Sequence, residues 1–132
     1  LVKELNITEE VFFLGNSTEV TKILCYTDVF LLPSQTESFG LAALEAMAAG
    51  TAVISTNTGG LPEVNIQGVT GYLSNLGDVA DMAKNAIAIS KEDAILEKFK
   101  QNAKNHTRQF SLESILPVYE AIYTSCYQKK EV

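Results

Sequence analysis

The sequence predicts an α/β domain in which helices flank a parallel β-sheet. Continuous apolar runs at residues 11–14 and 29–32 indicate two strands, residues 52–55 indicate a third, and residues 71–73 indicate a shorter fourth one. Runs that are apolar at every position are typical of parallel strands that are covered on both faces. Helical segments separate the runs, so the order β-α-β-α-β-α-β with trailing helices favours right-handed crossovers.

Capping residues set the limits of several predicted helices. Ser17 and Asp78 can each cap a helix N-terminus, and Gly50 can end the helix that begins at Leu41. In chain order, the expected segments are the end of a helix at 1–5, then 17–26, 41–49, a short helix opening within 58–63, one after Asp78, 92–108 and 115–127. The helix after Asp78 is expected to bury one face, made of Val79, Met82, Ala83, Ala86 and Ile87.

The last predicted helix carries Tyr119, Tyr123 and Tyr127 at four-residue spacing. Such side chains fall on one helix face, and we expect that face to pack on the body of the protein and not to stack on nucleic acid. His106, the single histidine, is expected to be solvated and not catalytic.

Composition limits the class of protein and its partners. With 132 residues, 46% of them hydrophobic and 20% charged, residues 1–132 are expected to form a single globular domain. The net charge of −6 argues against nucleic acid and anionic lipid surfaces as partners. No transmembrane segment is expected, because every apolar run is far shorter than the roughly 20 residues that span a bilayer.

The ends and the cysteines of the chain suggest its context. The chain starts at Leu1 with no initiator methionine and no signal-type apolar core, so we expect it to begin inside a larger protein. Cys25 and Cys126 lie far apart without CxxC spacing, which indicates neither a disulfide framework nor a zinc site. A reducing, cytoplasmic location fits this cysteine usage.

The loop at residues 33–40 is the first candidate binding site. It follows a predicted strand and precedes a helix, and ligands of open parallel sheets sit at the carboxyl ends of strands. The helix start carries a partial positive charge of about half a unit and can hold a phosphate through the amides of Ser38, Phe39, Gly40 and Leu41. Alternatively, the segment is an ordinary helix start in which Gly40 serves backbone shape alone.

Two carboxylates, Glu37 and Glu45, are separated by seven residues and can face one cleft. Glu37 can accept sugar hydroxyls or stabilise positive charge at an anomeric carbon, and Glu45 can accept the vicinal hydroxyls of a ribose. Alternatively, the helix dipole favours an acidic residue at Glu37, and Glu45 is a solvated helix residue. The apolar neighbours of Glu45 argue for a retained partner.

These motifs resemble those of a known enzyme family. Residues 33–50, PSQTESFGLAALEAMAAG, with Val53-Ile54 and with GGLPE at 59–63, resemble the retaining nucleotide-sugar glycosyltransferases of family four. The Glu-x7-Glu spacing is intact, and the likeness continues through VTGYL at 69–73 and Phe110-Ser111. It implies two Rossmann-like domains in the GT-B arrangement, with the sugar donor bound by the C-terminal one. This chain would be most of that donor-binding domain, without its first strands and without the N-terminal acceptor domain.

The resemblance also implies a reaction and a role for each matched residue. A sugar would pass from a nucleoside diphosphate sugar, such as a UDP-sugar, to an acceptor hydroxyl on a small molecule or glycan, with retention at the anomeric carbon. The sequence of the motifs most resembles that of the branch that joins N-acetylglucosamine to L-malate for bacillithiol synthesis. The implied roles are a catalytic contact to the donor sugar for Glu37, sugar and diphosphate binding for Ser38, Phe39, Gly40 and Leu41, ribose binding for Glu45, and an edge of the base pocket for Gly15 and Asn16.

No metal or other cofactor is expected, because the family neutralises the diphosphate with an Arg and Lys pair and a helix end. That basic pair would lie before Leu1, so the chain alone is expected to bind donor weakly and to be inactive. The absent first strands would leave a sheet edge unpaired, which opens a route to self-association.

Two alternatives remain at this point, an epimerase and a non-catalytic module, while the sequence counts against a phosphorylase. A nucleotide-sugar epimerase would interconvert donors without an acceptor. A pyridoxal phosphate phosphorylase needs a Schiff-base lysine near the cleft, and no lysine lies between Lys22 and Lys84. A non-catalytic nucleotide-binding or interaction module would neither hydrolyse nor transfer from any donor.

Overall fold

A three-stranded parallel sheet lies at the centre of the computed structural model, which describes residues 1–128. Its strands are β1 (Val29–Leu32), β2 (Ala52–Thr56) and β3 (Gly71–Ser74), in the order β1-β2-β3. All residues of β2 are buried, as expected for a parallel strand covered on both faces. The α/β class and the parallel sheet are therefore confirmed, with three strands where the sequence predicted four.

One face of the sheet is covered by α1 (Val20–Cys25), α2 (Leu41–Ala48) and the short α3 (Leu61–Val64). Their apolar side chains meet β2 at Val53, and the resulting buried cluster is Leu24, Ala43, Ala46, Met47, Val53, Leu61, Val64 and Ala103. Small alanines on α2 allow this helix to lie close to the strands. The cluster fixes the start of α2 relative to the carboxyl end of β1.

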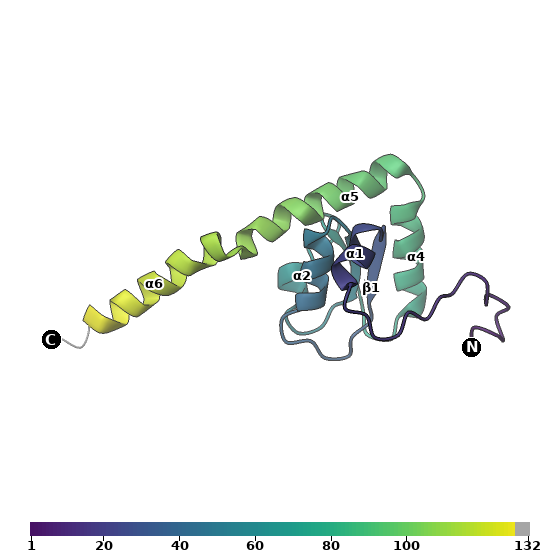
Figure 1. Cartoon of the computed structure of the whole chain (residues 1–132), viewed down its shortest axis with the longest axis horizontal. Coiled ribbons are helices and arrows are strands. Elements are labelled where there is room, and N and C mark those ends of the chain that lie inside the picture. Colours follow the sequence, from purple (N-terminus) through teal and green to yellow (C-terminus); the bar gives the residue numbers. More distant parts are fainter. Residues whose placement is uncertain (129–132) are drawn as a thin grey trace.

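The other face is covered by α4 (Val79–Ser90) and by part of α5 (Asp93–His106), which runs across the end of the sheet (Figure 1). Ala52, Ile54, Ile89 and Phe99 form its buried cluster. α5 joins both layers, because Phe99 belongs to this cluster and Ala103 to the first.

The predicted apolar face of α4 is wrong in part. Met82 and Ala86 do pack against the core, whereas Val79, Ala83 and Ile87 are exposed. The side chain of Asn85 donates to Ser74 Oγ at 3.1 Å, which turns α4 so that Asn85 and Ile89 face the sheet.

The N-terminal segment forms no strand, contrary to the prediction for residues 11–14. Residues 1–19 contain only turns and bends, so the predicted helix end at 1–5 is also absent, and α1 begins at Val20 instead of near Ser17. Phe12 and Phe13 are 78% and 85% exposed, and the segment leads away from the sheet (Figure 1). An apolar run becomes a strand only when a neighbour satisfies its backbone groups, and no described strand pairs with this run.

The last helix projects from the body. α6 (Leu112–Gln128) follows the 3₁₀ turn η1 (Thr107–Phe110), and η1 is its main contact among the described elements. Figure 1 shows α6 extending beyond the end of α5. Tyr119, Tyr123 and Tyr127 are exposed, so the expectation that they pack on the body is wrong. Within residues 1–128, no helix combines the length and apolarity needed to cross a membrane.

Candidate functional site

The loop between β1 and α2 is anchored at both ends. At its start, the hydroxyl of Thr56 donates to the carbonyl oxygen of Ser34 at 2.6 Å. At its end, Gly40 is the N-cap of α2 with a φ of 98°, a left-handed conformation that side chains disfavour. The loop is thus held at the carboxyl end of β1, where parallel sheets bind ligands.

Glu37 is held by both its side chain and its backbone. Its Oε1 atom accepts a hydrogen bond from the N–H of Gly40 at 3.2 Å, and its carbonyl oxygen accepts one from the N–H of Gly60 at 3.2 Å. The side chain is half-buried, and within residues 1–128 no donor is bound to Oε2. One carboxylate oxygen therefore positions the loop while the other is free to contact a ligand.

Three glycines bring neighbouring loops into contact at this point. A Cβ atom on Gly59 would lie 1.7 Å from the carbonyl oxygen of Glu37, and one on Gly60 would lie 2.6 Å from that of Ser38. A Cβ on Gly40 would lie 2.8 Å from Leu61 Cδ2. The structure thus shows that the backbone conformation and the contact with Leu61 are enough to require glycine at position 40.

The open hollow beside this contact is lined by Thr36, Glu37, Ser38, Thr58 and Gly59 and has a volume of about 640 Å³. The N–H of Gly40 is engaged by Glu37. In the described chain, the N–H groups of Ser38, Phe39 and Leu41 have no hydrogen-bond acceptor. The first turn of α2 contains no acidic residue, and the one carboxylate bonded at this helix start is that of Glu37, which leaves these three N–H groups unbonded. These groups suit an anionic ligand.

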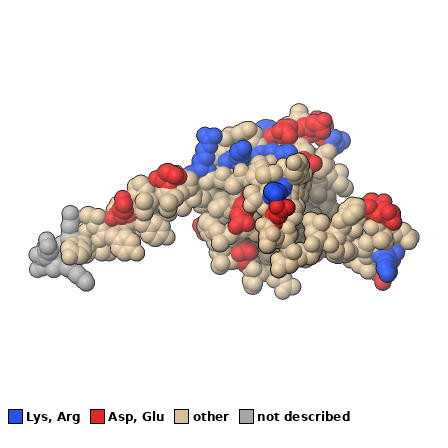
Figure 2. Space-filling view, viewed as in Figure 1, with Lys and Arg blue, Asp and Glu red and all other residues tan. Residues whose placement is uncertain are grey.

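The Lys and Arg side chains of residues 1–128 do not line this hollow. Figure 2 shows Lys and Arg gathered over α5, where Lys98, Lys100 and Lys104 are located, with Arg108 in η1. No Lys or Arg is among the residues that line the hollow at Glu37. A diphosphate at the start of α2 would therefore need cations from outside residues 1–128.

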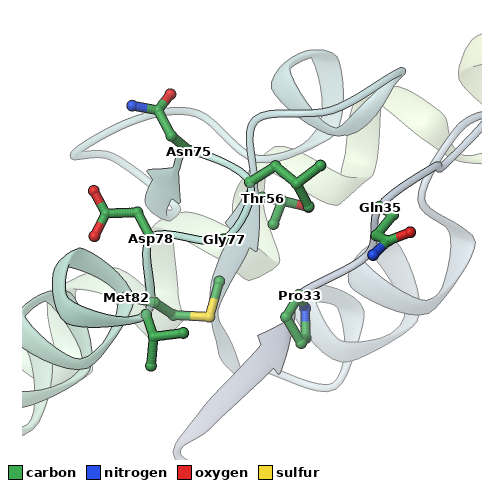
Figure 3. Close-up of a pocket in the computed structure, with 9 residues that line it drawn as sticks. Pro33, Gln35, Thr56, Asn75, Gly77, Asp78 and Met82 are labelled. Atoms are coloured by element: carbon green, nitrogen blue, oxygen red, sulfur yellow. The ribbon is translucent and has the colours of Figure 1, made fainter.

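A second pocket, which the sequence reading missed, lies at the carboxyl ends of all three strands. Its volume is about 190 Å³, and Figure 3 shows Gln35, Thr56, Asn75 and Asp78 around it. Asp78 Oδ1 accepts the N–H of Asp81 at 2.9 Å and so caps α4, as predicted. The position of Asn75 and Asp78 directly after the third strand was the signal that could have revealed this pocket. The remaining lining residues are Pro33, Leu76, Gly77, Val79 and Met82.

Glu37 and Glu45 do not line the same hollow. Glu45 is exposed on the second turn of α2, and it forms no ion pair with the described residues. It borders a hollow of about 390 Å³ together with Cys25 of α1 and Lys104 of α5. The expectation that both carboxylates face one cleft is therefore not met within this chain.

The other predicted contacts are distributed differently. Gly15 and Asn16 are exposed in the N-terminal segment, where an added Cβ on Gly15 would meet nothing within 4 Å. The ring of Phe39 packs edge-on against Phe110, with centroids 5.8 Å apart, so it anchors the loop to η1. His106, expected to be solvated, is half-buried and packs on Phe110 in turn, with centroids 5.5 Å apart.

Comparison with known proteins identifies the family. Residues 1–106 match the family described as "Glycosyl transferases group 1". The chain is 43% identical over 124 residues to the N-acetyl-alpha-D-glucosaminyl L-malate synthase of Bacillus anthracis, which covers 93% of this chain and 32% of that protein. The chain thus spans about a third of the length of this relative.

Solved structures share the fold. Sucrose-phosphate synthase from Thermosynechococcus elongatus is 29% identical with a TM-score of 0.86, covering 97% of this chain and 33% of that one. The C-terminal domain of LpcC, a group 1 glycosyl transferase of Francisella tularensis, is 28% identical with a TM-score of 0.73, covering 82% and 57%. Anabaena HepE, solved in complex with UDP-glucose, has a TM-score of 0.83 at 23% identity, covering 93% and 35%.

These structural neighbours are GT-B glycosyltransferases, and the sequence match spans most of the chain. The chain belongs to the glycosyl transferases group 1 family.

Proposed function

We propose that this chain is most of the donor-binding C-terminal domain of a retaining glycosyltransferase. The enzyme would transfer a sugar from a nucleoside diphosphate sugar to an acceptor hydroxyl. The family match and the share of about a third of the relative's length support this assignment. The likeness to the C-terminal domain of LpcC supports the same position within the longer protein.

One observation carries the proposal: Glu37 is locked at the start of α2 beside N–H groups without acceptors in residues 1–128. In the proposed complex, Glu37 Oε2 contacts the donor sugar near the anomeric carbon and stabilises charge that develops there. The amides of Ser38, Phe39 and Leu41 bind the sugar and diphosphate. Gly40 contributes the shape of the loop, because its own N–H is already engaged.

The nucleoside would be held on either side of this point. Glu45 accepts the ribose hydroxyls, and Gly15 with Asn16 borders the base. Both contacts require the N-terminal segment or an additional part of the protein to close over the hollows at α2. No metal takes part, since the start of α2 and cations from elsewhere in the protein would neutralise the diphosphate.

The finer assignment is transfer of N-acetylglucosamine from a UDP-sugar to L-malate in the cytoplasm. The 43% identity to the Bacillus anthracis enzyme supports the sugar and the acceptor, and the UDP-glucose bound to HepE supports a uridine nucleotide. Two exposed free cysteines are compatible with a reducing compartment.

The full-length protein tests this directly. Incubated with UDP-N-acetylglucosamine and L-malate, it should form an α-linked product, detected by mass spectrometry and by the anomeric coupling constant in NMR. The 132-residue chain alone should form none. Donor interconversion without acceptor would instead indicate an epimerase, and no turnover of any nucleotide sugar would indicate a binding module.

We also propose that the chain self-associates through the outer edge of β1. β1 pairs with β2 on one side only, and in the described residues no strand lies on its other side. The strand that pairs with this edge would be the apolar run at residues 11–14 of a second copy, because its exposed phenylalanines favour strand structure.

A further inference from the structure

Asn65 is a fully buried amide directly after α3. Its Nδ2 atom, with two N–H donors, lies within hydrogen-bond distance of three acceptors: the carbonyl oxygens of Val53 and Tyr72, at 3.2 and 3.1 Å, and Ser55 Oγ at 3.1 Å. Its Oδ1 atom accepts the hydroxyl of Thr70 at 2.9 Å. A buried side chain with every polar atom bonded specifies one position for the backbone that carries it.

The acceptors of the Asn65 amide belong to two neighbouring strands. Val53 lies on β2 and Tyr72 on β3, so the amide ties both strands to the end of α3. The fit is close: a Cβ on Gly71 would lie 2.9 Å from Asn65 Oδ1. An apolar residue of similar volume would leave these acceptors without their donor inside the core.

Asn65 is also linked to the candidate site through a single helical turn. Its N–H donates to the carbonyl oxygen of Leu61 at 2.8 Å, and Leu61 fills the space against Gly40. The residue before Leu61 is Gly60, whose N–H binds the carbonyl oxygen of Glu37. α3 has four residues, so a shift at Asn65 moves Gly60 and Leu61 with it.

We propose that Asn65 is a positioning residue for the glycosyl transfer proposed above, on which this inference rests. By fixing α3 to the sheet, it holds Gly60 against Glu37 and Leu61 against Gly40. It touches no substrate and acts through the geometry of the Glu37 loop. Misplacement of a reacting group by about 1 Å can reduce a rate by about 10²-fold, so the effect should appear in kcat.

Two sets of variants in the full-length protein test the proposal. Asn65→Leu removes the amide, with Asn85→Leu as the matched control, because Asn85 also binds β3 through Ser74 but makes no hydrogen bond to α3. Thr70→Val removes the hydroxyl bonded to Asn65 Oδ1 and keeps its shape, whereas Thr70→Ser keeps the hydroxyl. The Thr70 pair is the milder test, in case Asn65→Leu does not fold.

Hydrogen exchange and kinetics give separate readouts. In Asn65→Leu and Thr70→Val, amide exchange in peptides covering 36–41 and 57–61 should rise at least about tenfold, with little change in α4 and α5. Transfer should lose kcat by about 10-fold or more with a smaller change in KM. Thr70→Ser and Asn85→Leu should resemble the wild type in both.

Unchanged exchange at 36–41 in Asn65→Leu and Thr70→Val would overturn the proposal. So would a uniform rise over all peptides, because that would mark Asn65 as a general stabiliser of the core. If the wild type transfers no sugar, the proposed function fails, and the local exchange pattern still decides whether Asn65 holds the Glu37 loop.

Discussion

Gly59 lies so close to Glu37 that a methyl group on Gly59 would be 1.7 Å from the Glu37 carbonyl oxygen. The two residues come from the loops after consecutive strands, β2 and β1. The N–H of Gly60 then closes the contact with a hydrogen bond to the same oxygen. The position of the catalytic candidate is therefore set by backbone packing between two loops and not by its side chain alone.

Replacement of Gly59 by alanine should destabilise the protein and disrupt the Glu37 loop. The left-handed backbone at Gly59 alone costs about 1–3 kcal/mol for a non-glycine residue, and the clash with backbone adds to it. Gly68→Ala is the control, because Gly68 also has a positive φ but open space around its Cβ position. Urea unfolding should show a clearly larger loss for Gly59→Ala, and equal losses would argue against the loop contact.

Replacement of Glu37 should separate its two roles. Glu37→Gln keeps an oxygen that can accept the N–H of Gly40, so the free energy of unfolding should stay within about 0.5 kcal/mol of the wild type. The loss of charge should lower kcat by about 10²-fold or more if Glu37 stabilises the transition state. Glu37→Ala should lose stability as well. Full activity in Glu37→Gln would remove the carboxylate from the mechanism.

Replacement of Glu45 by alanine should weaken binding of the nucleotide donor without affecting stability. Loss of the hydrogen bonds to the ribose hydroxyls should cost roughly 1–3 kcal/mol, measured by isothermal titration of UDP- and GDP-sugars against the full-length protein. Glu120→Ala, on an exposed face of α6, is the matched control. An affinity that stays unchanged would return Glu45 to the role of a solvated helix residue.

Lys100 should give a stability contribution that disappears at high pH. Its Nζ lies 3.1 Å from Asp28 Oδ1, and this hydrogen bond is the main reason that the pKa of Lys100 is raised above 10.5, with Glu97 adding to it. Because the folded pKa is the higher one, the contribution is present in full below about 10.5 and is lost as the pH rises through the raised value.

The size of this contribution should be small, about 0.5 kcal/mol, because Asp28 is 66% exposed. Urea unfolding of Lys100→Met and wild type should therefore differ at pH 7, and the difference should shrink as the pH rises above about 10.5 and through the raised pKa of Lys100. Lys98→Met is the control, because Lys98 on the same helix forms no ion pair with the described residues. A difference that does not change with pH in this range would point to packing of the lysine stem instead.

Self-association through the edge of β1 predicts a concentration-dependent dimer. Phe13→Lys places a charge in the exchanging segment and should leave the chain monomeric in light scattering, since a charge on a pairing strand opposes edge-to-edge contact. Tyr26→Lys changes another exposed aromatic residue, outside the segment, and should leave dimer formation unchanged. A dimer that survives Phe13→Lys would place the contact elsewhere.

The sequence predicted the elements whose signals are local. The apolar runs of β1 and β2 and the alanine-rich α2 appear where expected, because burial and helix propensity act on those residues directly. The run at residues 11–14 has the same composition but no strand beside it in the described chain, and pairing cannot be read from composition.

The candidate site was predictable to a similar extent. The loop at the start of α2 was found from its position after a strand, and Glu37 does lie there. The contact of Gly59 with Glu37 and the buried role of Asn65 depend on how separate segments meet. In the sequence, glycine pairs and an asparagine indicate only turns.

The projecting helix α6 is connected to the candidate site through η1. A helix of 17 residues is about 25 Å long. It joins the described body mainly through η1, whose last residue, Phe110, touches Phe39 in the Glu37 loop. A displacement of the distal end of α6 would therefore act on η1, and through the contact of Phe110 with Phe39 it would reach that loop. Binding of any partner to α6 would in this way affect the conformation of the loop at the start of α2.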